Sequence, residues 1–157
     1  MKDAQRSPIA IAPGARLVMV ISPYYGGVAE AMQRGAQAVA EEAKASLERV
    51  VVPGAFEIPA AIALAAKTNA YDGFLALGCV VRGETSHYDY VCGESARALM
   101  DLSVREGLSI GYGILTVNTL AQAEERADPK RGDKGGEAAR AALAMIALKR
   151  RLAETAR

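Results

Sequence analysis

The chain has 157 residues, of which 51% are hydrophobic and 24% charged, and its formal net charge is +1. This length fits one domain with a sizeable core, and the lack of a basic excess gives no electrostatic reason to expect nucleic-acid binding. No apolar run is long enough to cross a bilayer, and the first eight residues lack the apolar core of a signal peptide. We therefore expect a cytoplasmic protein that binds no membrane.

Apolar periodicity and turn residues divide the chain into alternating strands and helices. In chain order, we predict a strand at 17–21, a helix at 28–45, a strand at 47–52, a helix at 58–67, a strand at 73–81, a helix at 86–105, a strand at 109–116 and a helix at 136–154. Thr119 and Gln122 have the spacing of a capping box, which predicts a further short helix before a polar loop at 128–135.

The predicted strands are all so apolar that none is expected to be half exposed. Strand–helix alternation with such strands predicts a parallel sheet covered by helices on both faces, a three-layer α/β domain. Another apolar run, at 9–12, has no obvious partner in this chain, and we expect it to pair with another subunit. The predicted organisation is an N-terminal arm over 1–12 and a single domain over 13–157.

The segments that follow the strands of a parallel sheet meet at one edge, where ligands bind. Four segments should gather there, namely 22–27, 53–58, 82–87 and 116–119. The third of them contains His87, the only histidine of the chain, and histidine is well suited to proton transfer near neutral pH. The segment at 82–87 also leads into the predicted helix at 86–105, whose free N-terminal N–H groups suit a phosphate.

The candidate residues on these segments also have ordinary structural interpretations. Tyr24 can stack on a flat heterocycle, but its position alone favours simple packing. Glu57 can accept hydrogen bonds from ligand hydroxyls or complement the dipole of the next helix. Residues 85–86 can cap a helix as well as bind a phosphate, because both roles use the same N-terminal N–H groups. A lone histidine such as His87 is more often structural than catalytic.

Four further residues also have ordinary structural interpretations. Arg126 and Lys134 suit a phosphate, but they also fit solvated surface charges. Cys79 and Cys92 have no metal-ligand spacing and lie in apolar patterns, so we expect reduced core thiols and no metal site.

Taken together, these segments resemble the lumazine synthase family over nearly the whole chain after its first dozen residues. The residues that carry the resemblance read VPGAFEIP at 52–59, GCVVRGETSHYDYV at 78–91, GILT at 113–116, ER at 125–126 and DKG at 133–135. The resemblance implies that 5-amino-6-(D-ribitylamino)uracil condenses with 3,4-dihydroxy-2-butanone 4-phosphate to 6,7-dimethyl-8-ribityllumazine, with loss of phosphate and water. This is the penultimate step of riboflavin biosynthesis, and it requires no cofactor.

The resemblance also implies roles for individual residues. His87 would transfer protons, Tyr24 would stack on the pyrimidine ring, and Glu57 would bind ribityl hydroxyls. The other residues implied to contact the organic substrates are Ala55, Phe56, Ile58, Val80, Val81, Tyr112 and Lys134. The implied phosphate clamp consists of Gly83, Glu84, Thr85 and Arg126. The positions that match residues serving a neighbouring subunit's pocket are Tyr112, Arg126 and Lys134.

The family implies a flavodoxin-like fold with a four-stranded parallel sheet, whose N-terminal segment adds a strand to a neighbouring subunit. Its members form pentamers, some of which assemble into hollow icosahedral shells, so the active sites lie at subunit interfaces. The short loop at 128–135 favours a shell, although Pro129 and Arg131 depart from the loop common in shell-forming members.

Three places depart from the family pattern and bear on substrate affinity. The first loop reads Pro23-Tyr24-Tyr25 where an arginine and an asparagine usually flank the aromatic residue, Cys79 replaces threonine or alanine, and Tyr112 replaces phenylalanine. The aromatic pair supports an alternative function, a catalytically weak cage protein that binds lumazine or flavin.

Overall fold

The computed structural model of the protein describes residues 6–156, in which strands and helices alternate. The elements are β1 (Arg16–Ile21), α1 (Gly26–Glu42), β2 (Ser46–Val51), a 3-10 turn η1 (Ala55–Glu57), α2 (Ile58–Ala66), β3 (Gly73–Val81), α3 (His87–Arg105), β4 (Ser109–Val117), α4 (Leu120–Ala127) and α5 (Lys134–Thr155). Every strand and helix predicted within the domain is present, with ends that differ by up to three residues. The predicted helix at 28–45 ends early, at Glu42, and Lys44 just beyond it has a left-handed φ of 56°.

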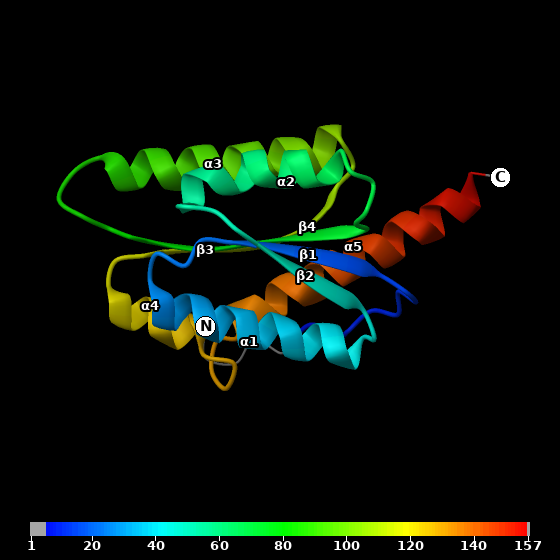
Figure 1. The fold of residues 1–157 in the computed structure, drawn as a ribbon, viewed down its shortest axis with the longest axis horizontal. Coiled ribbons are helices and arrows are strands. Elements are labelled where there is room, and N and C mark those ends of the chain that lie inside the picture. The colour runs from blue at the N-terminus through cyan, green and yellow to red at the C-terminus, as the bar shows by residue number, and fades with distance from the viewer. Residues whose placement is uncertain (1–5, 157) are drawn as a thin grey trace.

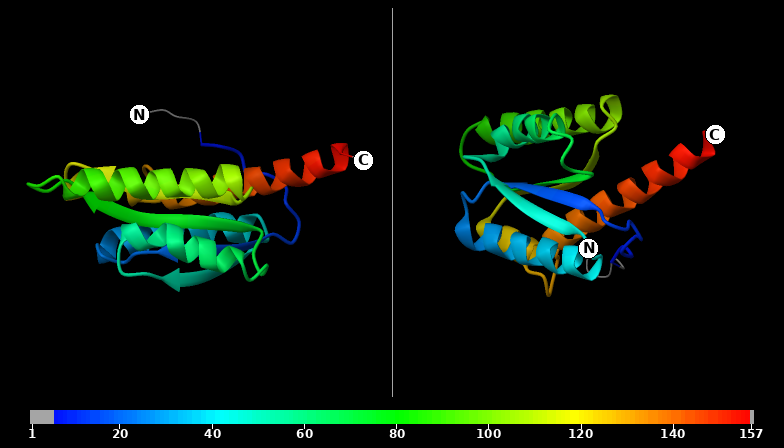
Figure 2. Two further views of the ribbon diagram at one scale, coloured as in Figure 1. Left: turned by 90° about the horizontal axis from the view of Figure 1, so that it is seen from above. Right: turned by 45° about the vertical axis from the view of Figure 1, so that its right-hand side comes forward.

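The middle layer is a four-stranded parallel sheet with the strand order β2-β1-β3-β4. Helices α2 and α3 cover one face, and α1, α4 and α5 cover the other (Figure 1). This three-layer, flavodoxin-like arrangement confirms the predicted fold class. The last turns of α5 extend beyond the sheet and are exposed (Figure 2).

Strand β1 is central because both of its faces are apolar. Leu17, Met19 and Ile21 pack against α1 and α5, while Val18 and Val20 pack against α2 and α3, and all five side chains are almost fully buried. Alternate residues of a strand point to opposite faces, so a continuous apolar run is what a strand covered on both sides requires.

The expectation that no strand is half exposed is wrong for β2. Its residues are exposed or half-buried, and Glu48 and Arg49 stand in the middle of the strand. The reason is topological: β2 is an edge strand, so only one of its two sides has a hydrogen-bonded neighbour.

Small residues allow α5 to approach the sheet and α1 very closely. A Cβ atom at Gly111 on β4 would overlap the backbone carbonyl of Ala138, and one at Gly135 would overlap the backbone of Met32 on α1. Any side chain at these two positions would push α5 away from its neighbours.

The N-termini of two helices are capped by side chains. At α4, the predicted capping box is confirmed, because Thr119 accepts the N–H of Gln122 and the Gln122 side chain accepts the N–H of Thr119. Helix α5 begins at Lys134 rather than near 136, because the buried carboxylate of Asp133 accepts the N–H of Gly136.

The predicted N-terminal arm lies partly outside the described residues. Residues 9–12 form no strand in the single chain, although Ile9 packs against the core and Ala12 is buried. Pairing of this run with a neighbouring subunit therefore stays a prediction. Within the described part of the chain, no helix combines the length and apolar character that a membrane span requires.

The packing of α5 predicts a large effect from one methyl group. We expect Gly111→Ala to lower the free energy of unfolding by about 1–3 kcal/mol, because the methyl group overlaps backbone rather than a flexible side chain. Gly93→Ala on α3 is the matched control, since its Cβ meets nothing within 4 Å and the change should be neutral or stabilising by up to about 1 kcal/mol. Urea denaturation measures both, and equal effects at the two sites would contradict the packing argument.

The pair of Arg16 and Asp72 predicts a pH-dependent contribution to stability. The Asp72 carboxylate accepts the backbone N–H of Arg16 at 2.8 Å and its guanidinium at 3.2 Å, and this hydrogen bonding lowers the pKa of Asp72. A lowered pKa in the folded state stabilises the protein above the unfolded pKa of about 3.9, and this contribution disappears as the pH falls through the folded value. The difference in unfolding free energy between wild type and Asp72→Asn should therefore shrink below about pH 4. A difference that stays constant down to pH 3 would mean that charge plays no part.

Candidate functional site

Three loops are fixed to the carboxyl edge of the sheet by backbone hydrogen bonds that continue the strand ladder. The N–H of Ser22 donates to Leu77 at 3.0 Å, that of Val52 to Ile21 at 3.0 Å, and that of Arg82 to Val117 at 2.8 Å. Each loop therefore starts from a point held by the neighbouring strand. The loops surround a cleft of about 790 Å³ between the end of the sheet and the start of α3.

Most of the predicted site residues line this cleft. They are Tyr24, Ala55, Phe56, Glu57, Val80, Val81, Gly83, Thr85 and His87. All four segments lie at the carboxyl edge as expected, since Val81 pairs with Val117 and the N–H of Arg82 donates to Val117. Segment 116–119 nevertheless contributes no residue to the lining of the cleft.

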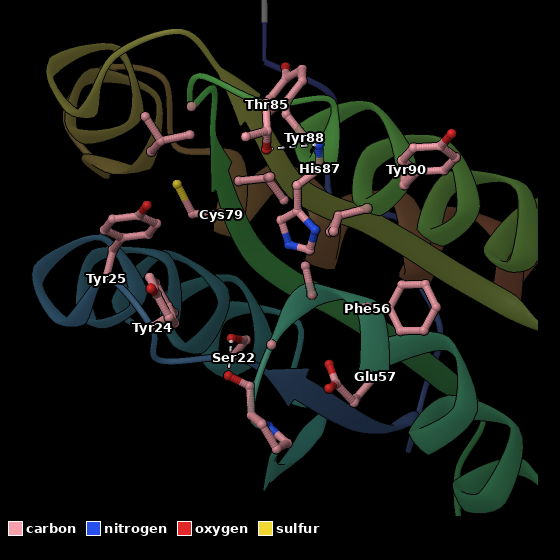
Figure 3. A pocket seen from close by; sticks show the side chains of 17 residues that line it. Ser22, Tyr24, Tyr25, Phe56, Glu57, Cys79, Thr85, His87, Tyr88 and Tyr90 are labelled. Atoms are coloured by element: carbon pink, nitrogen blue, oxygen red, sulfur yellow. Dashed lines mark hydrogen bonds between the residues drawn. The ribbon is translucent and has the colours of Figure 1, made fainter.

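His87 is the first residue of α3, and its imidazole projects into the cleft between Tyr24 and Phe56 (Figure 3). Its backbone N–H donates to the Thr85 hydroxyl at 3.3 Å. Ser86 makes no capping hydrogen bond with its side chain, so Thr85 is the residue that holds this end of the helix. Because Thr85 accepts a hydrogen bond from α3, its own O–H is available to donate to a ligand.

One wall of the cleft is aromatic. The Tyr24 ring is 75% exposed and meets Tyr25 edge to face, with 5.0 Å between ring centroids. Tyr25 packs partly against the core, and burial raises the pKa of its phenol. The exposed ring of Tyr24 thus faces the cleft, supported from behind by a ring that is anchored in the protein (Figure 3).

Glu57 and Phe56 form the opposite wall, on the 3-10 turn η1. Glu57 is the residue that precedes α2, yet its carboxylate makes no capping hydrogen bond. A Cβ atom at Gly54 would lie 3.2 Å from Glu57 Oε2, so the glycine leaves room for the carboxylate. The side chain is exposed at the cleft and free to accept hydrogen bonds from a ligand (Figure 3).

Five predicted residues lie outside the cleft of the single chain. Ile58 is fully buried beneath it, and Glu84 is exposed without lining it. The others are Tyr112 on β4, Arg126 in the last turn of α4 and Lys134, which begins α5 rather than lying in the preceding loop. Whether these three serve a neighbouring subunit stays a prediction.

Two of the residues outside the cleft have informative surroundings. Burial raises the pKa of the Tyr112 phenol, and the neighbouring Cys92 and Tyr88 on α3 raise it further. The Arg126 guanidinium donates to the carbonyl of Gln122 at 3.2 Å and is otherwise exposed.

The cleft also contains residues that were not predicted as site residues. They are Ser22, Tyr25, Pro53, Gly54, Cys79, Tyr88, Tyr90 and Val91. The loop positions 22, 53 and 54 belong to segments already expected at this edge. Tyr88 and Tyr90 lie close behind His87 in the sequence, at the start of α3. This proximity to His87 is the sequence signal that could have identified them as site residues.

Both cysteines are free thiols, as expected, but neither is fully buried in the core. Cys79 lines the cleft, and burial raises the pKa of its thiol to about 11. Burial also raises the pKa of Cys92. At neutral pH these thiols are protonated and poorly nucleophilic, so the arrangement offers no thiolate chemistry.

Comparison with known proteins identifies one family over most of the chain. The family model of 6,7-dimethyl-8-ribityllumazine synthase matches residues 14–150. Proteins of that name are similar to this chain in Methylobacterium radiotolerans, at 56% identity over 87% of this chain and 84% of the relative, and in Methylocella silvestris, at 54% over 89% and 88%. A 6,7-dimethyl-8-ribityllumazine synthase 1 of Rhodopseudomonas palustris is 50% identical over 98% of this chain and 99% of the relative. The chain belongs to the 6,7-dimethyl-8-ribityllumazine synthase family.

Proposed function

We propose that this chain condenses 5-amino-6-(D-ribitylamino)uracil with 3,4-dihydroxy-2-butanone 4-phosphate to 6,7-dimethyl-8-ribityllumazine, releasing phosphate and water. The observation that carries the proposal is the position of His87, whose imidazole faces a cleft with an aromatic wall on one side and a free carboxylate on the other. Membership of the synthase family supports the same reaction.

The organic substrates fit the two walls of the cleft. The exposed Tyr24 ring offers a stacking surface for the pyrimidine, and the backbone of Val80 and Val81 offers hydrogen-bonding groups at the end of β3. The Glu57 carboxylate, which has no partner among the described residues, suits the hydroxyl groups of a ribityl chain.

The phosphate fits the loop that precedes α3. Gly83 has open space around it, and the free N–H groups at the start of a 19-residue helix carry a partial positive charge. The Thr85 hydroxyl adds a donor, because it already accepts the N–H of His87. Glu84 contributes backbone rather than its carboxylate, which lies outside the cleft.

A phosphate also needs cations, and the cleft lacks them. Among the described residues that line it, none is lysine or arginine. Arg126 and Lys134 are exposed or half-buried on the far helical layer, where a neighbouring subunit can meet them. We infer that Arg126, Lys134 and Tyr112 complete the pocket of an adjacent subunit in a pentamer, which can assemble further into a shell. A monomer is then inactive.

The chemistry that these residues supply is positioning and proton transfer. The 5-amino group of the pyrimidine attacks the ketone carbon of the butanone phosphate, and loss of water gives an imine. His87, whose imidazole projects into the cleft, is the group that takes a proton from the attacking nitrogen and delivers one to the departing oxygen. Loss of the proton on the carbon next to the phosphate-bearing carbon then expels the phosphate as an anion, held by the loop and the cations. The ribitylamino nitrogen finally closes the ring on the second carbonyl carbon, with loss of a second water. An amine, a ketone and a phosphate leaving group react this way without a redox cofactor.

One specific observation favours a second candidate function. The edge-to-face pair of Tyr24 and Tyr25 forms a firm stacking surface at the mouth of the cleft, and such a surface suits a flat tricyclic flavin as well as a pyrimidine. A catalytically weak cage that binds lumazine or flavin is therefore the alternative.

A turnover assay separates the two functions. The purified protein is mixed with both substrates, and lumazine fluorescence is followed against a control without protein. A rate well above the spontaneous condensation is expected. Binding of lumazine or flavin without such a rate would instead support the cage.

Removal of the imidazole should slow the reaction. We expect His87→Ala to reduce kcat by roughly 10- to 1000-fold, which is modest for a general acid–base because the substrate amine is already nucleophilic. Gln37→Ala on the exposed face of α1 is the control, since Gln37 lies outside the cleft. Steady-state kinetics on both variants provide the measurement, and wild-type kcat in His87→Ala would make the histidine merely structural.

Loss of the guanidinium should weaken binding of the phosphate substrate. We expect Arg126→Ala to raise KM for the butanone phosphate by the equivalent of about 1.5–3 kcal/mol, as for other charged hydrogen bonds. Arg131→Ala in the next loop, where Arg131 pairs only with exposed Asp128, is the control. An unchanged KM in Arg126→Ala would remove Arg126 from the clamp.

Mixing the two impaired variants tests whether the pocket is shared between subunits. If His87 and Arg126 of one pocket come from different chains, random reassembly of His87→Ala with Arg126→Ala restores both residues in about a quarter of the pockets. Recovered turnover is the expected result. No recovery in mixed oligomers would place both residues in the pocket of a single chain.

A further inference from the structure

We propose that Arg82 is a positioning residue of the phosphate subsite, which fixes the loop at 83–86 by tying it across the sheet edge to Asn118. The inference rests on the function proposed above and assigns a role to a side chain that lies outside the cleft. Gly83 and Thr85 line the cleft, whereas Arg82 does not.

Three contacts hold the Arg82 side chain. Its Nε donates to the Asn118 side-chain oxygen at 3.1 Å, and its guanidinium carbon lies 4.2 Å from the ring centroid of Tyr88. A guanidinium nitrogen also lies 3.7 Å from Asp89, an exposed pair that contributes little by itself. The first two contacts connect the end of β4 to the first turn of α3, so they span the loop between β3 and α3.

The loop needs such a restraint because its own residues supply few. Residues 82–86 are all exposed, a Cβ atom added at Gly83 would meet nothing within 4 Å, and Ser86 makes no side-chain cap. The Thr85–His87 bond is local and only closes the helix end. Across the described residues, Arg82 provides the one side-chain hydrogen bond that joins this loop to an element other than α3.

Asn118, which accepts the hydrogen bond from Arg82, is itself held in place. Gln122 accepts the N–H of Asn118 at 2.8 Å and that of Thr119 at 3.3 Å, as part of the α4 capping box. The Gln122 carbonyl accepts from Arg126, further along the same helix. Arg82 therefore connects the loop that receives the phosphate in one pocket to the helix whose Arg126 serves the next pocket.

The geometry requires arginine rather than a simple positive charge. A guanidinium can lie flat on the Tyr88 ring and donate from Nε at the same time, because its donors lie in one rigid plane. A lysine ammonium can approach the ring but has no second donor at the position of Nε. Arg82→Lys thus keeps the positive charge and removes the hydrogen bond to Asn118.

The test compares KM for the two substrates. We expect Arg82→Lys and Asn118→Ala each to raise KM for the butanone phosphate about tenfold, which corresponds to one lost charged hydrogen bond. The KM for the pyrimidine should change by less than about twofold, because Tyr24, the proposed stacking partner of the ring, lies across the cleft from Thr85 with His87 between them (Figure 3). Asn118→Asp keeps the acceptor oxygen and should retain the wild-type KM.

The double variant decides whether the two residues act together. If Arg82 and Asn118 work through their shared hydrogen bond, the double variant raises KM for the phosphate substrate no more than either single variant. Arg34→Lys, on the exposed surface of α1, is the matched control and should leave both constants unchanged. Additive effects, an equal rise in both KM values or an unchanged KM in Arg82→Lys would each overturn the proposal.

Wild-type turnover in the same assay separates this inference from the function on which it rests. No wild-type turnover contradicts the proposed function. Wild-type turnover with kinetics that do not respond to Arg82→Lys contradicts only the role of Arg82.

Discussion

The site depends on backbone hydrogen bonds that run one residue past the ends of β1, β2 and β3. The N–H groups of Ser22, Val52 and Arg82 donate to carbonyl groups of the neighbouring strands, at Leu77, Ile21 and Val117. These bonds use no side chain, so they fix where every loop of the cleft begins whatever the loop's own sequence is. The parallel order β2-β1-β3-β4 determines which loops become neighbours, and it places the loop after β1 between the other two. A departure such as Tyr25 therefore places a different side chain in the cleft wall, while the start of its loop is held by the neighbouring strand.

The other helical layer supports the sheet from behind through very close packing. Gly111 and Gly135 bring α5 against the sheet and α1, and Gly35 leaves room for the buried Asp133 carboxylate. Asp133 also pairs with Arg140, which compensates its charge inside the protein. Because Lys134 follows directly, the same packing determines where this cation lies on the outer surface of the subunit.

The single chain divides the chemistry between two surfaces. The cleft holds the aromatic wall, the carboxylate and the imidazole, whereas the cations that a phosphate needs lie on α4 and α5. Under the arrangement proposed above, a subunit binds the uncharged parts of its substrates with its own residues, and the facing surface of a neighbour balances the phosphate. Assembly and catalysis are then coupled, because dissociation removes the cations of the proposed anion clamp. Within one chain, Arg82 in the cleft loop is connected through Asn118 to Gln122 on α4. These side chains therefore lie between the cleft and the helix that carries Arg126.

The sequence by itself determined the elements and most of the cleft. β1 and β3 are apolar on both faces, which requires central strands, and the spacing of Thr119 and Gln122 specifies a helix start through two short-range hydrogen bonds. Such features depend on residues close together in the chain, so periodicity and motifs predict them. Only the tertiary structure decided that β2 is an exposed edge and that 116–119 stays outside the cleft. Each of these depends on which distant segment lies alongside, a choice made by packing rather than by local sequence.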